Sequence, residues 1–262
     1  MRMREEEEAL GHGTRIIDEG GGAADEQHYD GPVLCIFAID PGVSTGWVAL
    51  KVPVLALRGG SVARTLSRCR YLGGTIRRSG SGDAYGGGGS FSASDSAHVT
   101  EILSVAREVY GNWMPEWVEC DKCDGEGFFD NPEGSCRDEC EVCEGEGGEW
   151  DVENSDQFTF TFVLENFSLR NESMDPSLLA PVRVNSIFMD RLMMNESELR
   201  AWFQSPSDAK NSVTDDRLRR WGFWSIGSAH ERDAARHAIL FLRRFAANAD
   251  IRIKMFGHDP LA

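Results

Sequence analysis

Two apolar runs near residue 40 predict a pair of strands joined by a tight turn. VLCIFAI (33–39) and GWVALKV (46–52) flank the segment Asp40-Pro41-Gly42, whose Pro and Gly favour a turn. Later in the chain, FTFTFVLENF (158–167) alternates Phe with Thr and Val, which is the period of a strand, and carries Glu165 near its end. Two of the predicted strands therefore end on a carboxylate.

The remaining periodic segments predict further strands and helices. A third strand is expected within 62–77, and ELRAWFQ (198–204) predicts another. Expected helices are 97 to about 110, capped by Asp95 or Ser96, then 179–194, a short helix at 214–221, and an amphipathic helix at 230–246. The order β-β-β-α-β-α-β-α predicts an α/β fold with a mixed sheet and helices on its faces.

Three segments lack such periods. Residues 1–30 are acidic and predict a disordered tail, and the Gly/Ser-rich stretch 79–94 predicts a flexible loop. Residues 114–157 form an acidic, cysteine-rich insertion. We therefore expect one domain built from 31–113 and 158–250, interrupted by a small module at 114–157.

Charge is distributed unevenly between these parts. The chain of 262 residues has a formal net charge of −16, of which residues 1–30 contribute −6 and residues 114–157 contribute −14. The remainder is mildly basic, at +4, so the overall acidity does not exclude nucleic acid as a partner. Arginine pairs such as Arg77-Arg78 and Arg243-Arg244 could contact phosphates, or could simply be solvated surface.

Hydrophobic content and the N-terminus bear on location. The chain is 41% hydrophobic and 27% charged, which is typical of a globular protein, and no apolar run approaches the roughly 20 residues of a membrane span. The start MRMREEEEAL is too acidic for a signal peptide. We therefore expect a cytoplasmic protein with no membrane partner, where seven cysteines favour metal binding or free thiols over disulfides.

Three acids are candidates for a metal site. Asp40 and Glu165 end predicted strands, and Asp233 lies in the first turn of the last helix, on the same face as His230 and His237. Clustered carboxylates suit Mg²⁺ or Mn²⁺, and a pair of such ions can support phosphodiester cleavage. The alternative is structural: Asp40 can cap the turn, and Asp233 can interact with the helix dipole.

The same residues carry a resemblance to a known family. IDPG-x3-G-W at 39–47, LENF at 164–167 and H-x-x-D-A-A at 230–235 resemble the RuvC family of Holliday junction resolvases, which has a ribonuclease-H-like fold. The stretch from QSPSDAKNSV to HERDAARHAILFLRR is most similar to RuvC-like resolvases of actinobacterial phages. Apart from the insertion, the resemblance covers about residues 33–246.

This resemblance implies roles for individual residues. Asp40, Glu165 and Asp233 match the family's metal-binding carboxylates, so a site with two Mg²⁺ or Mn²⁺ ions is implied. His230 matches a position where many members have a further acid or a histidine, which makes it a fourth expected ligand. Lys210 matches a basic residue near the scissile phosphate. The second basic residue of cellular members has no match here, and Asp215-Asp216-Arg217 stands in its place.

His237 has two interpretations. It can be a histidine at the edge of the core with both ring nitrogens hydrogen-bonded, which we favour, or a direct metal ligand.

The cysteine-rich insertion contains two copies of CxxCxGxG. Cys120 and Cys123 form the first pair, and Cys140 and Cys143 form the second. Two such knuckles can close a tetrahedral structural Zn²⁺ site, with free thiols or a redox pair as the alternative. The repeat resembles the zinc knuckles of DnaJ chaperones over about 30 residues only. Because its surroundings are acidic, we expect the module to position the protein or to bind a protein partner. Cys35, Cys69 and Cys136 lie off the pattern and are expected to be ordinary thiols.

The function that this resemblance implies is a metal-dependent endonuclease, a hydrolase that resolves Holliday junctions and related branched DNA in recombination and repair. The protein would act as a homodimer, in the host cytoplasm if a phage encodes it. Two alternatives remain: an inactive DNA- or protein-binding scaffold with this fold, and a nuclease acting on flaps, forks or RNA.

Overall fold

The computed structural model of the chain describes residues 31–77, 93–113, 158–166, 179–194, 200–224 and 227–262, together with four short strands between residues 117 and 150. The predicted tail at 1–30, most of the predicted loop at 79–94 and the four knuckle cysteines lie outside these described residues. The predictions made for them stay predictions.

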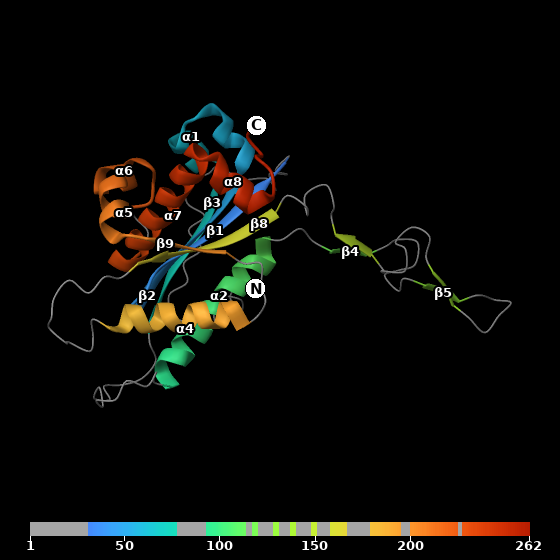
Figure 1. Ribbon diagram of the computed structural model, residues 1–262, viewed down its shortest axis with the longest axis horizontal. Helices are drawn as coiled ribbons and strands as arrows, with labels where there is room; N and C mark the ends of the chain where they lie inside the picture. Colours follow the sequence, from blue (N-terminus) through green and yellow to red (C-terminus); the bar gives the residue numbers. More distant parts are fainter. Residues whose placement is uncertain are drawn as a thin grey trace, which may run out of the picture.

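A five-stranded mixed sheet forms the centre of the molecule (Figure 1). Its strands lie in the order β3-β2-β1-β8-β9. Their bounds are β1 (Val33–Asp40), β2 (Ser44–Pro53), β3 (Arg70–Arg77), β8 (Phe158–Glu165) and β9 (Arg200–Gln204). Strand β2 runs antiparallel to β1 and β3, whereas β8 runs parallel to both β1 and β9. The predicted α/β class, with a mixed sheet flanked by helices, is confirmed.

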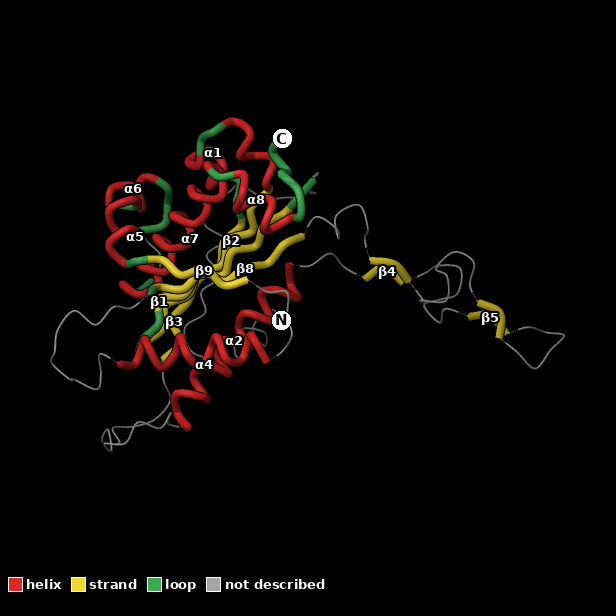
Figure 2. Tube along the Cα trace, in the orientation of Figure 1, coloured by secondary structure: helices red, strands yellow, loops and turns green. Residues whose placement is uncertain are grey.

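Helices cover both faces of the sheet (Figure 2). One face packs against α7 (Ala229–Ala247), accompanied by α8 (Ala249–Phe256) and the shorter α1 (Val62–Leu66), α5 (Pro206–Ser212) and α6 (Asp215–Arg220). The other face packs against α2 (Ala93–Trp113) and α4 (Ala180–Met194). A 3-10 helix, η1 (Val54–Gly59), follows β2.

Alternation along β1 explains how one strand serves both layers. Leu34, Ile36 and Ala38 belong to the core under α7, while Cys35, Phe37 and Ile39 belong to the core under α2 and α4. All six side chains are fully buried, so the run reads as continuously apolar in the sequence. Continuing this alternation, the next side chain on the face covered by α7 is that of Asp40.

Several helices differ from the sequence prediction. Helix α2 begins at Ala93 instead of 97, so Ala93 and Ser94, which the composition assigned to the loop, are helical. The helices α1, α5 and α8 were not predicted. The first two span 5 and 7 residues, too short for a 3.6-residue period to be recognised. In α8 the polar and apolar residues of ADIRIKMF alternate more like a strand, but Met255 packs into the core beside α7.

The insertion contains two short antiparallel strand pairs. Strand β4 (Trp117–Glu119) pairs with β7 (Gly148–Trp150), and β5 (Phe128–Asp130) pairs with β6 (Arg137–Glu139). In the sequence, each CxxC pair directly follows one of these strands, β4 or β6.

Among the described helices, none combines the length and the apolar character needed to cross a membrane.

Candidate active site

The sheet register brings the strand-end carboxylates together. Ile39 of β1 pairs with Leu164 of the parallel strand β8, so Asp40 and Glu165 are the next residues on two neighbouring strands. Glu165 in turn pairs with Gln204 at the end of β9. Because side chains alternate between faces, Asp40 and Glu165 share the face that α7 covers. Two of the three predicted acids thus lie side by side at one end of the sheet.

Asp40 is a buried carboxylate in an electronegative setting. It is only 8% exposed, and burial raises its pKa from 3.8 to about 6. His230 opposes this rise, since its Nδ1–H donates to Asp40 Oδ2 at 2.8 Å. The charges of Glu165 and Asp233 both push the pKa of Asp40 upward. All three predicted acids are therefore close enough to interact electrostatically.

A close approach of β2 fixes the start of α7 over this sheet end. A Cβ on Gly46 would lie 2.1 Å from the backbone carbon of His230, so only glycine permits the contact. The helix begins with a capping box, in which the Glu231 backbone N–H donates to the Ser228 hydroxyl and the Ser228 backbone N–H donates to the Glu231 carboxylate. Glu231 is buried and also accepts a 2.5 Å hydrogen bond from Thr75 of β3. These contacts set the position of His230 and Asp233.

Glu165 is held by histidine and amide side chains. His237, one turn beyond Asp233 on α7 and 1% exposed, donates from Nε2 to Glu165 Oε2 at 3.0 Å. Its Nδ1 lies 3.2 Å from Gln204 Oε1. Asn185 of α4 donates to the backbone oxygen of Glu165 at 2.9 Å. His237 is therefore a buried histidine with partners on both ring nitrogens, as the favoured interpretation predicts, and one partner is a candidate metal ligand.

Asp233 is paired with two cations. The ammonium of Lys210 lies 3.2 Å from Asp233 Oδ2, and Arg236 bonds Asp233 Oδ1. Arg236 is 8% exposed and also bonds Asp215, while its Nε donates to Val213 O at 3.1 Å. Lys210 is 56% exposed in its side chain, so it is the cation of this pair that solvent and substrate can reach.

These pairings determine what the site can hold. Within the described ranges, no three Asp, Glu, His or Cys side chains already form a group arranged to hold a metal ion. The carboxylate oxygens nevertheless suit a hard cation such as Mg²⁺. The buried Asp40 is repelled by the negative charges of Glu165 and Asp233, and a bound cation would neutralise this repulsion. Asp40, Glu165 and Asp233 could hold Mg²⁺ or Mn²⁺ once Asp233 turns from its pairing with Lys210. His230 already contacts Asp40.

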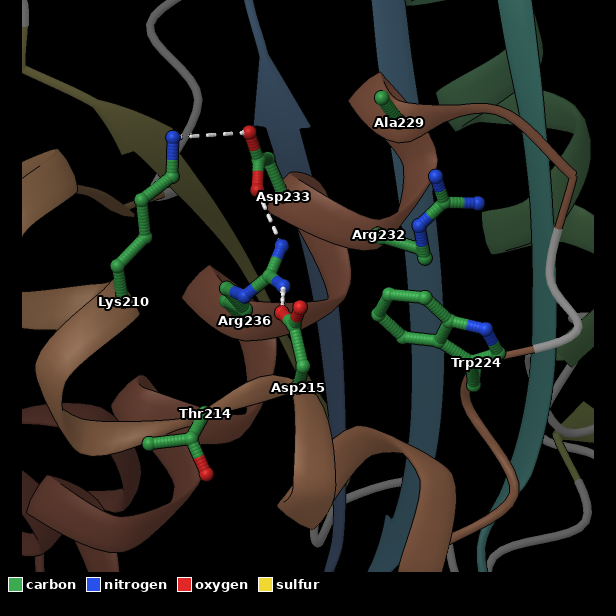
Figure 3. A pocket seen from close by; sticks show the side chains of 8 residues that line it. All are labelled: Lys210, Thr214, Asp215, Trp224, Ala229, Arg232, Asp233 and Arg236. Carbon is green, nitrogen blue, oxygen red and sulfur yellow. Dashed lines mark hydrogen bonds and ion pairs between the residues drawn. The ribbon is translucent and has the colours of Figure 1, made fainter.

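A cleft of about 490 Å³ opens beside Asp233. Figure 3 shows its two walls. On one side Lys210, Asp233, Arg236 and Asp215 form a chain of ion pairs. On the other side the guanidinium of Arg232 lies over the indole of Trp224.

The sequence indicated some of these residues and missed others. Asp40, Glu165, His230, Asp233 and Lys210 lie around one end of the sheet. Arg236, Arg232 and Trp224 were not singled out, because an arginine on an amphipathic helix and a tryptophan in a turn look like ordinary surface. Only the H-x-x-D-x-x-R-H spacing at 230–237, which places four polar residues along one side of α7, could have suggested Arg236.

The two cysteines in the described core are free thiols. Burial raises the pKa of Cys35 well above 9.0 and that of Cys69 to about 12. Both thiols are therefore unreactive at neutral pH, in agreement with the prediction that they are ordinary.

Comparison with known proteins gives distant structural likenesses only. No protein-family model matches the chain, and no curated protein matches it. Among solved structures, the chain is similar to Thermus thermophilus RuvC in complex with a Holliday junction substrate, with 12% identity and a TM-score of 0.42, covering 80% of this chain and 94% of the other. A second Thermus thermophilus RuvC structure gives 11% identity, a TM-score of 0.39 and the same coverage.

Proposed function

We propose that this chain is a metal-dependent endonuclease that cleaves branched DNA. The observation that carries the proposal is the convergence of Asp40, Glu165 and Asp233 at one end of the sheet, where the charges of Glu165 and Asp233 add to the cost of ionising the buried Asp40. A buried cluster of this kind costs stability unless cations neutralise it. The motifs at 39–47, 164–167 and 230–235 support a RuvC-like activity.

Each residue has a defined task in this proposal. Asp40, Glu165 and Asp233 would hold two Mg²⁺ or Mn²⁺ ions, with His230 as a further ligand or as an orienting partner of Asp40. Such ions, when bound, activate water and stabilise the leaving oxygen. His237 and Gln204 orient the Glu165 carboxylate, and the capping box around Glu231 keeps α7 in place.

Lys210 and Arg236 differ in what they offer a substrate. Arg236 is buried between two carboxylates and serves to position Asp233. Lys210 is exposed at the rim, so its ammonium can contact the phosphate being cleaved and stabilise negative charge that develops there. A pair of chains would cut two strands of a four-way junction symmetrically, and the insertion at 114–157 would bind Zn²⁺ and a protein partner.

Cleavage of a panel of DNA substrates tests the proposal. We expect the full chain with Mg²⁺ to cut a mobile four-way junction faster than a flap, and a linear duplex least. Replacing Mg²⁺ by a chelator should stop cleavage.

Asp40→Asn, Glu165→Gln and Asp233→Asn should each lose at least 100-fold in cleavage rate, since removing one stabilising group costs that order, while junction binding survives. Asp190→Asn, at an exposed position on α4, is the matched control.

The panel separates the alternatives. Binding without cleavage by the parent protein would favour the scaffold with this fold. Equal cleavage of flaps and junctions would favour a broader structure-specific nuclease. Parent-like cleavage by any one of the three acid variants would remove that acid from the site.

A further inference from the structure

The cleft beside Asp233 has a second wall that the proposed chemistry does not use. It lies between α5, α6 and the first turns of α7, so it adjoins the predicted metal site directly. Its lining residues are Lys210, Thr214, Asp215, Trp224, Ala229, Arg232, Asp233 and Arg236. The wall opposite Lys210 consists of Arg232 and Trp224 (Figure 3).

The cationic side chains around this cleft differ in how far they are neutralised. Arg236 is paired with Asp215 and Asp233, and Lys210 shares Asp233. In the described part of the chain, no carboxylate forms an ion pair with Arg232, whose Nη1 donates to the backbone oxygen of Gly227 at 3.0 Å. The Arg232 wall therefore presents a positive charge that an anion could neutralise.

Two arginines, Arg219 and Arg232, stack on the ring of Trp224. The Cζ atom of Arg219, on α6, lies 4.0 Å from the centroid of the Trp224 ring, and that of Arg232, on α7, lies 4.9 Å from it. Arg219 also pairs with Asp216 at 3.1 Å, but the side chain of Asp216 is 86% exposed, and exposed pairs of this kind hold weakly. Stacking on an aromatic ring restrains a guanidinium while leaving its N–H edge available, which is the arrangement that binds phosphate in a bidentate way.

We propose that Arg219 and Arg232, oriented by Trp224, bind a backbone phosphate of the DNA strand that enters the active site. The inference rests on the proposed nuclease function for its substrate. With Lys210 at the cleaved phosphate on one side of the cleft, the arginine pair on the other side holds a neighbouring phosphate of the same strand. The pair thereby fixes the direction in which the strand crosses Asp233.

Binding measurements without cleavage test this subsite. Fluorescence anisotropy of a labelled four-way junction, in EDTA and over a range of NaCl concentrations, gives the affinity and its salt dependence. For Arg232→Gln and Arg219→Gln we expect about ten-fold weaker binding, with the slope of log K against log salt reduced by about one, since each duplex phosphate contact contributes about 0.9. Arg220→Gln is the control for charge, because Arg220 is an exposed arginine on the same helix as Arg219 and, unlike Arg219 and Arg232, does not stack on Trp224.

Variants of Trp224 test whether the orientation of the two arginines matters, because they leave the charge of the protein unchanged. Trp224→Phe keeps a ring for the arginines and should bind within about three-fold of the parent protein, whereas Trp224→Ala should resemble the arginine variants. Thermal unfolding of every variant checks that the fold is intact. The two arginine variants are the decisive ones, because Arg232 lines the cleft and the exposed Arg219 stacks on Trp224, which also lines it.

The outcomes distinguish this inference from the nuclease itself. If Arg219→Gln and Arg232→Gln both bind with the affinity and slope of Arg220→Gln, the subsite is wrong even if the parent protein cleaves junctions. If the arginine variants bind weakly and the parent protein cleaves no DNA, the subsite stands as a phosphate contact and the proposed nuclease function fails.

Discussion

Asp40 lies at the end of a fully buried strand, where a negative charge is costly. Burial is the main cause of its raised pKa, and Glu165 and Asp233 add to it. A carboxyl group whose pKa is higher in the folded state stabilises the fold below its unfolded pKa of 3.8, and this stabilisation is lost as the pH rises through about 6. At neutral pH without metal, the ionised Asp40 therefore opposes folding.

Asp40→Asn should make the metal-free protein more stable. In EDTA at pH 8 we expect the free energy of unfolding to rise by up to about 3 kcal/mol, the equivalent of a shift of about two pKa units. The gain should disappear near pH 4, where Asp40 is protonated in the folded protein. Chemical denaturation at both pH values measures it, with Asp190→Asn as the exposed control. A variant less stable than the parent protein at pH 8 would contradict this electrostatic account.

At the residue scale, the sequence identifies the acids better than their partners. Asp40 and Glu165 stand out because a charge ends an apolar run, and strand register alone makes neighbours of them. Which cation pairs with Asp233, and which side chain holds Glu165, depends on how α5 and α7 pack. Lys210 and Arg236 come to Asp233 from two different helices, which no local spacing predicts.

Among the elements, the crossing of β2 and α7 is the contact on which the site depends. Gly46 lies against the backbone of His230, and the side chain of Glu231 reaches across to Thr75 of β3. The first turn of α7 is thus locked to the antiparallel part of the sheet, while Asp233 and His237 face its parallel part. Any outward shift of this turn moves Asp233 away from Asp40.

Gly46→Ala should damage both the fold and the site. The added Cβ would overlap the backbone of His230, so α7 must move, and we expect a loss of about 1–3 kcal/mol in unfolding free energy together with most of the cleavage rate. Gly111→Ala is the matched control, because nothing lies within 4 Å of a Cβ at this exposed position in α2. The control should gain about 0.5–1 kcal/mol. Normal cleavage by Gly46→Ala would show that the α7 contact is not required.

The strands and long helices were predictable because each has a clear period. FTFTFVLE alternates, and α7, a helix of 19 residues, carries an apolar stripe from Ala234 to Phe245. Of the two short helices beside α7, α6 was predicted at 214–221, whereas α5 was missed, since a helix of 7 residues takes its stability from packing. The cleft lies where α5, α6 and α7 meet, so the sequence indicated Lys210 and Asp233 singly but not the cleft that they share.

At the scale of the whole molecule, charge separates the parts. The body of the protein, meaning residues 31–113 and 158–262, carries a net charge of +4. The segments 1–30 and 114–157 carry net charges of −6 and −14. The residues that we assign to DNA, Lys210, Arg219 and Arg232, all belong to the body. This division supports a DNA-binding core with an acidic insertion that serves another purpose.

The insertion should contain one structural zinc ion. Elemental analysis of the full chain, purified without added metal, should give about one Zn²⁺ per chain, held by Cys120, Cys123, Cys140 and Cys143. A Cys120→Ser and Cys140→Ser double variant should lose it, while Cys136→Ser, off the motif, should retain it. Absence of zinc, or disulfides among the four cysteines, would refute the assignment.

The claim that Asp40, Glu165 and Asp233 bind divalent ions is tested most directly by a calorimetric titration with Mn²⁺. The parent protein and Asp190→Asn should bind two ions per chain at this site, and Asp40→Asn, Glu165→Gln and Asp233→Asn should each lose at least one of them. Ions attracted to the acidic insertion contribute equally to all variants, so the difference isolates the sheet-end site. Equal stoichiometry and affinity in the parent protein and in all three acid variants would contradict the account.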